Sequence, residues 1–225
     1  MIIAVIGQKG GCGKSTIAVH LAGWRTNIGK VVLLIDSDRQ GTARHWSLTR
    51  SDENLPTPET IQLFDRSIGR SAVNFSRRFD DIIIDVAGGD ELAIATSLRI
   101  ADMGIVPFQP NELDVWTGGY LEDMVMPAQA LNNKLRVLAV MNRAPTHHAS
   151  TDVRRAVEAL AELECIEWTG HIVKERSALR RCVPAGALID EWEQPNDRNA
   201  ISEMVGVYQL MFAESVRGLA VSGAA

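Results

Sequence analysis

Short runs of apolar, often β-branched residues alternate along the chain with longer segments in which apolar residues recur at helical spacing. The runs predict strands at 2–6, 31–36, 81–86, 103–108, 135–142 and 167–173. The longer segments predict helices near 15–27, 40–50, 90–101, 113–132, 151–164 and 198–218. Four of the strand runs are apolar on both faces, which is typical of a parallel sheet covered by helices on both sides. The pattern therefore predicts an α/β fold with a doubly wound, mostly parallel sheet.

The length of the chain and its polar stretches give no sign of a second domain. At 225 residues the chain can build one α/β domain with a large core, so we expect residues 1–225 to form a single domain. The stretch 50–62 is polar and holds two prolines, which predicts a surface excursion rather than a linker. No apolar run approaches the ~20 residues of a membrane span. Met1 leads directly into a strand-like run rather than into a signal peptide.

Composition narrows the classes of function. Three cysteines at unrelated spacings, with no CxxC pair, argue against a disulfide framework or a structural zinc site and favour a cytoplasmic setting. A formal net charge of −5 excludes a generally basic nucleic-acid coat. Any contact with DNA is therefore expected from a local patch.

The segment GQKGGCGKSTIA, from Gly7 to Ala18, lies between a buried strand and a predicted helix, which is the setting of a phosphate-binding loop (P-loop). Its glycines let backbone N–H groups approach phosphates closely, and the start of the helix adds to the attraction. We expect Lys14 to reach the β- and γ-phosphates of a nucleotide and the Ser15 hydroxyl to bind Mg²⁺. The predicted nucleotide-binding residues of this loop are Gly10, Gly11, Cys12, Gly13, Lys14, Ser15 and Thr16.

Carboxylates follow the next two predicted core strands. Asp36 and Asp38 stand at the end of one strand and Asp85 at the end of another, and the carboxyl ends of parallel strands meet at the edge of the sheet that carries the P-loop. One such aspartate is a common helix cap, but three beside one P-loop indicate a Mg²⁺ site. We expect Asp36 to order the Mg²⁺ shell and Asp85 to hold the ion through water.

These segments carry a resemblance to a known family. KGGCGKST resembles the deviant Walker A motif KGGxGK[ST]T of the ParA/MinD family of ATPases, and DSDRQGTA is similar to its DxDPQG(N/S)A segment, with Arg39 replacing the proline. IIIDVAGG resembles its Walker B strand, VPFQPNELD (106–114) its PxxPxxLD segment, and 171–192 its late stretch of an arginine, a small helix and a glycine. The resemblance runs from residue 1 to about 215. Since no helix-turn-helix precedes the first strand, it points to the short ParF-like members.

The resemblance implies a deviant Walker P-loop fold and an ATPase that uses ATP and Mg²⁺. It also explains Lys9, a second lysine for which the P-loop itself has no need. In this family the equivalent lysine crosses to the partner subunit and contacts the phosphates bound there, so Lys9 is expected to join two chains into an ATP-dependent homodimer.

Catalysis is expected to rest on Lys9, Lys14 and Asp38. Asp38 is expected to position the water that attacks the γ-phosphate, while the two lysines stabilise the developing charge. Hydrolysis is expected to be slow and to be stimulated by a partner protein. Asn142 and Arg143 are candidates for the adenine pocket, as is the segment around Ile172 and Val173.

The segment KERSALRR is a candidate DNA-binding patch. It holds four basic residues and one acid, and Arg176 and Arg180 are four positions apart, which predicts one face of a helix. The proposed contacts to DNA are Lys174, Arg176, Arg180 and Arg181, with Arg154 and Arg155 as a weaker pair. No base-reading element is apparent, so binding is expected to be independent of sequence and to place the protein on the nucleoid.

The expected function is partition or positioning of an intracellular cargo through an adaptor, most commonly a centromere-binding protein on a plasmid. A chromosome, a chemoreceptor array, a carboxysome or a conjugation apparatus would need the same ATPase. A MinD-like membrane-associated ATPase is an alternative, but the tail stripe Ile201, Val205, Tyr208 and Phe212 is expected to pack on the sheet, and we expect no stable membrane association.

Enzymes outside the positioning ATPases fit less well. A dethiobiotin-synthetase-like enzyme remains a further alternative, although it leaves the DxDxQG pattern and the basic segment unexplained. A nitrogenase-iron-protein-like carrier would need two cysteines placed as cluster ligands, and a tyrosine kinase of this superfamily would need a C-terminal tyrosine cluster. The chain has neither.

Overall fold

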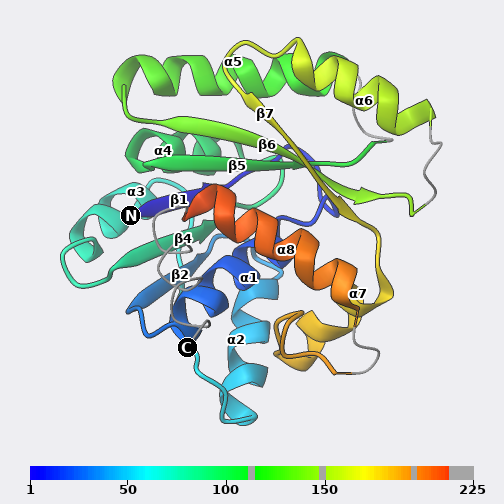
Figure 1. Ribbon diagram of the computed structural model, residues 1–225. Helices are drawn as coiled ribbons and strands as arrows, with labels where there is room; N and C mark the ends of the chain where they lie inside the picture. The colour runs from blue at the N-terminus through cyan, green and yellow to red at the C-terminus, as the bar shows by residue number, and fades with distance from the viewer. Residues whose placement is uncertain (111–114, 147–150, 194–196, 213–225) are drawn as a thin grey trace, which may run out of the picture.

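A seven-stranded parallel sheet forms the centre of the computed structural model, which describes residues 1–110, 115–146, 151–193 and 197–212 (Figure 1). Its strands are β1 (Ile2–Val5), β2 (Val32–Asp36), β3 (Glu59–Gln62), β4 (Asp81–Asp85), β5 (Met103–Phe108), β6 (Arg136–Ala144) and β7 (Glu167–Lys174). Every strand pair is parallel, in the order β3-β2-β4-β1-β5-β6-β7. The predicted doubly wound α/β fold is confirmed.

Helices cover both faces of the sheet. They are α1 (Lys14–Asn27), α2 (Thr42–Asp52), α3 (Ser67–Phe75), α4 (Glu91–Ile100), α5 (Val115–Leu131), α6 (Thr151–Ala161), α7 (Ser177–Cys182) and α8 (Arg198–Met211). One core cluster joins the sheet to α1, α2, α7 and α8, and the other joins it to α3, α4, α5 and α6. Strands β1, β2 and β4 are buried along their whole length, which explains why they read as continuous apolar runs.

Two elements depart from the prediction. The stretch 50–62, expected to be a surface excursion, ends in β3, a four-residue strand at the edge of the sheet whose side chains are exposed or half-buried. Helix α3 follows it and was not predicted, although Ile68 and Ala72 are fully buried and Phe75 packs on the same core. With four residues, none of them buried, β3 offers neither an apolar run nor a clear alternation from which a strand could be predicted.

The order of the strands places the ligand site. Strand β1 lies between β4 and β5, and the chain leaves β1 toward β2 on one side while β5 continues the sheet on the other. Ligands of such sheets bind at the carboxyl ends of the strands where the order reverses. The loop after β1, which holds the P-loop sequence, lies at that point (Figure 1).

Helix α8 buries the apolar stripe expected of the tail. Tyr208 and Phe212 are buried, Ile201 and Val205 pack against the same core, and Trp24 of α1 stacks on Tyr208 with ring centroids 4.9 Å apart. The predicted helix extended to residue 218, of which 213–218 lie outside the described residues, as do 113–114 of the predicted helix 113–132. No helix in the described part of the chain is both long enough and apolar enough to cross a membrane.

A buried arginine joins the last turn of α2 to the segment that precedes α8. Arg50 is fully buried and pairs with Glu191 through two hydrogen bonds of 2.6 and 2.7 Å, while its Nη1 also donates to the Gly186 carbonyl at 3.0 Å. Gly186 has a φ of 71°, and a Cβ there would lie 2.6 Å from the Arg50 nitrogen. The late glycine is therefore required by both conformation and space.

Gly186→Ala is expected to lower the free energy of unfolding by about 2–3 kcal/mol, because it adds a clash with the backbone of α2 to an unfavourable φ. Gly29→Ala is the matched control, since Gly29 has a φ of 82° but open space around it, and should cost only about 1 kcal/mol. Urea unfolding of both variants measures the difference. Equal losses would show that the contact with Arg50 carries no weight.

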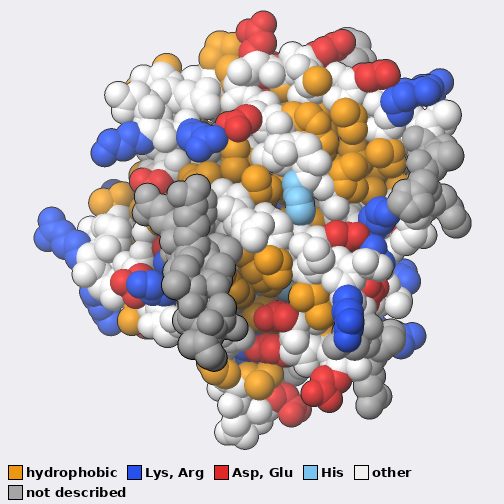
Figure 2. All heavy atoms as spheres, in the orientation of Figure 1, with side chains coloured by type: hydrophobic (Ala, Val, Ile, Leu, Met, Phe, Trp, Pro, Cys, Tyr) orange, Lys and Arg blue, Asp and Glu red, His pale blue; other side chains and the backbone are white. Residues whose placement is uncertain are grey.

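Charged side chains of both signs share the surface. Figure 2 shows acidic and basic side chains interspersed over the face that it draws, with apolar and polar surface between them. The net charge of −5 is thus not gathered into one acidic region on this face.

Candidate functional site

The loop between β1 and α1 has the backbone of a phosphate cradle. Gly11 and Gly13 adopt positive φ angles of 85° and 100°, which only glycine adopts at low cost. The first helical hydrogen bond runs from Ile17 N–H to the Gly13 carbonyl at 3.0 Å, so the amino end of α1 opens directly onto the loop. The predicted P-loop residues therefore come together at the start of a helix.

Side chains from the ends of β5 and β6 bind the outward carbonyls of this loop. Gln109 Nε2 and Arg143 Nη1 each donate to the Gly11 carbonyl at 2.6 Å, and Asn142 Nδ2 donates to the Cys12 carbonyl at 2.7 Å. A Cβ on Gly13 would lie 2.0 Å from that Asn142 nitrogen, so the amide and the glycine fit together. Asn142 and Arg143, predicted near the adenine, thus shape the P-loop itself.

Gln109 was not predicted as a site residue. It ends the strand run VPFQ, immediately before Pro110, and it is 9 % exposed. A polar residue at the carboxyl end of a buried strand was the signal that could have found it.

The two lysines of the loop differ in their surroundings. Lys14 is 7 % exposed, and its ammonium group donates to the Lys9 carbonyl at 2.7 Å and lies 3.8 Å from Cys12 Sγ. The side chain of Lys9 is exposed and makes no hydrogen bond or ion pair within the described ranges. Lys14 therefore belongs to its own loop, whereas Lys9 leaves its charge at the surface.

The strand-end carboxylates lie side by side. Asp36 and Asp85 are directly paired in the register of β2 and β4, and both are buried. Asp36 accepts backbone N–H groups of Asp38 and Arg44 at 3.0 and 2.9 Å, while half-buried Asp38 accepts that of Gln40 at 2.9 Å. The turn therefore forms in spite of Arg39, whose guanidinium lies 5.0 Å above the Phe64 ring.

Asp85 is the unusual member of this group. Burial raises its pKa to about 7, helped by the charges of Asp36 and Asp38 and opposed by a Ser15 hydrogen bond and by Lys14. Its Oδ2 atom is buried and has no hydrogen-bond partner within the described residues. A buried carboxylate oxygen without a partner, beside a hydroxyl and a second carboxylate, suits an ion.

Ser15, Asp36 and Asp85 fit a Mg²⁺ ion held largely by water and phosphate. The described residues contain no cluster of three or more His, Cys, Asp or Glu side chains that would bind a metal by themselves. Mg²⁺ commonly keeps several waters and takes one or two protein ligands next to nucleotide phosphates. Asp36 could accept such waters, since its backbone bonds leave lone pairs free.

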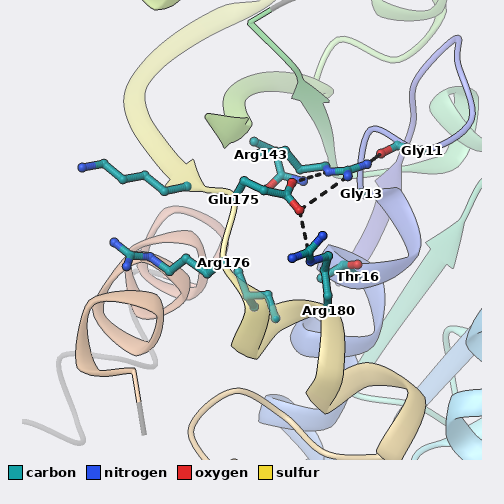
Figure 3. Close-up of a pocket in the computed structure, with 10 residues that line it drawn as sticks. Gly11, Gly13, Thr16, Arg143, Glu175, Arg176 and Arg180 are labelled. Carbon is teal, nitrogen blue, oxygen red and sulfur yellow. Dashed lines mark hydrogen bonds and ion pairs between the residues drawn. The ribbon is translucent and has the colours of Figure 1, made fainter. Parts of the chain in front are cut away.

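A cavity of about 180 Å³ lies beside the P-loop, between the ends of β6 and β7 and helix α7 (Figure 3). Its lining includes Gly11, Gly13, Thr16, Asn142, Arg143 and Leu179. Glu175 bridges two of its three arginines, at 2.5 Å from Arg143 Nε and 3.4 Å from Arg180 Nε. Figure 3 shows both arginines pointing toward this carboxylate from different elements. Ile172 and Val173, also named as candidates, are not among its lining residues.

The predicted basic patch is less available than its sequence indicated. Arg176 is not within a helix with Arg180 but precedes α7 in extended conformation, so the expectation of a shared helical face is wrong. Its guanidinium binds Glu203 at 2.6 Å and Asp197 at 3.3 Å, and its side chain is 13 % exposed. Lys174 lines the cavity, Arg180 pairs with Glu175, and Arg181 is exposed. Ion pairs with Asp197, Glu203 and Glu175 therefore occupy two of the four basic side chains that were predicted to bind DNA.

Comparison with known proteins now decides the family. Residues 3–189 match the family model described as "CobQ/CobB/MinD/ParA nucleotide binding domain". The chain belongs to this family. The resemblance to ParA/MinD proteins noted in the sequence is thereby confirmed, and the P-loop sequence lies within the matched nucleotide-binding domain.

Relatives of this chain include a carboxysome distribution protein and a protein named for inhibition of sporulation initiation. The chain is 29 % identical over 213 residues to "Maintenance of carboxysome distribution protein A" of Halothiobacillus neapolitanus, covering 92 % of this chain and 87 % of that protein. It is 55 % identical over 146 residues to "Sporulation initiation inhibitor protein Soj" of Bacillus subtilis, covering 48 % and 58 %. The ATP complex of a McdA variant from Cyanothece shares the fold, with a TM-score of 0.69, 16 % identity and coverage of 93 % and 95 %.

In protein free of nucleotide and Mg²⁺, Asp85→Asn is expected to raise the free energy of unfolding at pH 8 by roughly 1–3 kcal/mol. The folded-state pKa of about 7 lies above the unfolded value near 4, so wild-type stability falls as the pH rises between the two values. The gain should therefore shrink toward pH 4–5. Thermal unfolding from pH 5 to 8 measures it.

Asp81→Asn is the matched control, because Asp81 is equally buried but is paired with Arg25 at 2.5 Å. Its loss should destabilise the protein at pH 8, since the buried Arg25 guanidinium would lose its ion pair with Asp81. A gain from Asp85→Asn that is constant over this pH range would contradict the burial of an ionised Asp85.

Proposed function

We propose that this chain is a ParA-type ATPase that binds ATP with Mg²⁺, closes into an ATP-dependent homodimer, and positions plasmid DNA or another intracellular cargo through an adaptor protein. In this proposal the dimer binds the DNA of the nucleoid without sequence preference, and the adaptor stimulates a slow hydrolysis. The observation that carries it is the division between the two lysines of the loop.

We expect Lys14, rather than Lys9, to serve the nucleotide of its own chain. Its ammonium group is buried within the loop, whereas the Lys9 side chain is exposed at the rim of the same loop. An exposed cation beside a phosphate site is suited to the phosphates of a second, facing site. Two facing nucleotides would repel each other strongly, and a lysine from each chain would offset that repulsion.

Hydrolysis would use residues already held at the edge of the sheet. Asp38 is half-buried, and its Oδ1 is fixed by the Gln40 N–H, which leaves Oδ2 to orient a water toward the γ-phosphate. Lys14 and the partner's lysine would stabilise charge on the transferred phosphoryl oxygens. Mg²⁺, held near Ser15, Asp36 and Asp85, supplies further charge neutralisation when bound.

The names of the relatives support a positioning role and leave the cargo open. One is named for carboxysome distribution and another for inhibition of sporulation initiation. A MinD-like attachment to membranes would need an apolar helix free to insert. The described part of α8 has its apolar stripe packed on the sheet instead.

Lys9→Ala is expected to keep ATP affinity within about threefold of the wild type but to abolish ATP-dependent dimerisation. Close charge pairs buried at interfaces couple by ~1.5–7 kcal/mol, and loss of this coupling is enough to dissociate a dimer of micromolar affinity. Light scattering after size exclusion with ATP·Mg²⁺, paired with a nucleotide titration, measures both quantities. Lys14→Ala is the control and should lose ATP binding itself. A Lys9→Ala protein that still dimerises with ATP would remove the basis of the proposal.

Asp38→Ala is expected to retain ATP and the dimer while hydrolysis falls by a factor on the order of 10² to 10⁴, because the attacking water loses its positioning group. Phosphate release at saturating ATP, alongside light scattering on the same sample, measures the change. Wild-type rates of phosphate release in this variant would assign the water to another group.

A further inference from the structure

Helix α3 and its flanks form the most basic unbroken stretch in the described structure that no role above uses. From Arg66 to Phe79 the sequence RSIGRSAVNFSRRF contains four arginines and no acid. The segment KERSALRR has the same number of basic residues but includes Glu175. In a chain of net charge −5, such a stretch needs a physical explanation.

Three arginines of this stretch are exposed around α3. Ile68, Gly69 and Ala72 are buried against the core, so the opposite side of the helix faces solvent. Arg66 is the N-cap, Arg70 lies four positions later within the helix, and Arg77 lies in the turn that follows it. A turn continues the helix beyond Phe75, with the Arg78 N–H donating to its carbonyl at 2.8 Å. We name Arg66, Arg70 and Arg77 the α3 basic face.

Carboxylates do not neutralise this face. Within the described residues none of its arginines has an ion pair within 4.0 Å. Of the acids that flank the stretch, exposed Asp65 makes no ion pair in the described structure, Asp80 accepts the Val31 N–H at 2.9 Å, and Asp81 pairs with Arg25. Arg78 is set apart from the face, because its guanidinium lies 5.7 Å above the Phe79 ring.

Helix stability does not explain these arginines. Arg66 is the N-cap of α3 and makes no capping hydrogen bond, and the first turn contains no acid. Positive charges at the amino end of a helix oppose its dipole, and like charges four residues apart repel each other. Arg66 and Arg70 therefore lie where they cost the helix stability, and a bound anion would reverse that effect.

We propose that the α3 basic face binds the phosphate backbone of duplex DNA. This inference rests on the proposed function, which requires DNA binding, and it assigns that binding to a surface other than the segment 174–181. In that segment Glu203, Asp197 and Glu175 already pair with Arg176 and Arg180. The α3 face keeps its three guanidinium groups available for phosphate.

The dimensions and side-chain type of the face suit a duplex. Helix α3 itself, nine residues long, advances about 13 Å, or roughly four base pairs of DNA, over which both strands present about eight phosphates. Arginine binds phosphate through two parallel hydrogen bonds, which gives it an advantage over lysine at such contacts. Figure 2 shows basic side chains projecting from the left side of the molecule, where Figure 1 places α3.

An anionic membrane is the less suitable partner. Surface helices that bind lipid carry a broad apolar face beside their basic residues. On α3 the apolar residues Ile68 and Ala72 are buried, and Val73 is the one large apolar side chain on the exposed side of the helix in the described structure. Charge is thus available to a partner on this face, whereas apolar surface is not.

The test uses the full chain with ATP·Mg²⁺ and a fluorescent duplex of arbitrary sequence, with anisotropy measured at several salt concentrations. Arg70→Ala/Arg77→Ala should weaken binding at least about tenfold near 0.1 M salt and should make the slope of log affinity against log salt less steep by about 2 per chain. Arg70→Lys/Arg77→Lys should retain most of the slope. The thermal unfolding temperature of these variants should be no lower than that of the wild type, and their ATPase rate should match it, since the side chains are exposed.

Lys134→Ala/Arg136→Ala is the matched control, because it removes the same charge from exposed positions that no proposed DNA contact includes, and it should change affinity less than twofold. Unchanged binding in the α3 variant, with loss in Arg180→Ala/Arg181→Ala, would overturn the α3 assignment and leave the proposed function standing. A wild-type dimer that binds no duplex would overturn DNA binding itself. Arginine-dependent binding to phosphatidylglycerol vesicles, without binding to DNA, would also overturn the assignment.

Discussion

The phosphate loop depends on the hydrogen bonds that its own carbonyl groups accept. A loop that points its N–H groups inward must turn its carbonyls outward, and Gln109, Asn142 and Arg143 bind those of Gly11 and Cys12. Each such bond contributes about 0.5–1.5 kcal/mol, but leaving a buried carbonyl without a partner costs more. The positive φ angles of Gly11 and Gly13 are held in this way by β5 and β6. The sheet therefore positions the loop through its carbonyls and leaves the N–H groups for a ligand.

The same arrangement leaves the centre of the site electrically incomplete. Lys14 is buried with a carbonyl and a thiol as neighbours, while Asp85 is buried with an oxygen that has no partner in the described structure. Burial penalises the charged form of each group unless an opposite charge lies nearby. A nucleotide phosphate would complete the surroundings of Lys14, and a hydrated cation those of Asp85. Burying these two groups lowers the stability of the empty protein. Recovering that free energy would favour binding of the nucleotide and the cation together.

The parts of this molecule that could be predicted are those governed by burial along one segment. Buried strands read as apolar runs, and the parallel order then brings Asp36 and Asp85 to one edge without further information. β3 escaped prediction because an edge strand of four half-polar residues has no such run. The ion pairs of Arg176 could not be predicted, because its partners Glu203 and Asp197 lie 27 and 21 residues away along the chain. In the sequence Glu175 is the one acid of a basic segment, with no sign of its role. In the folded chain it forms ion pairs with both Arg143 and Arg180.

The two edges of the sheet have a consequence for how copies of this chain can meet. At one edge, β3 has four residues and follows Pro58 directly. At the other edge, β7 is irregular, with shifts in its register against β6 and a positive φ of 73° at Gly170. Short or kinked edges offer little of the regular ladder that an added strand requires. When many copies are crowded together, reversible contacts between them are therefore favoured, and edge-to-edge pairing into the continuous sheets of aggregates is disfavoured.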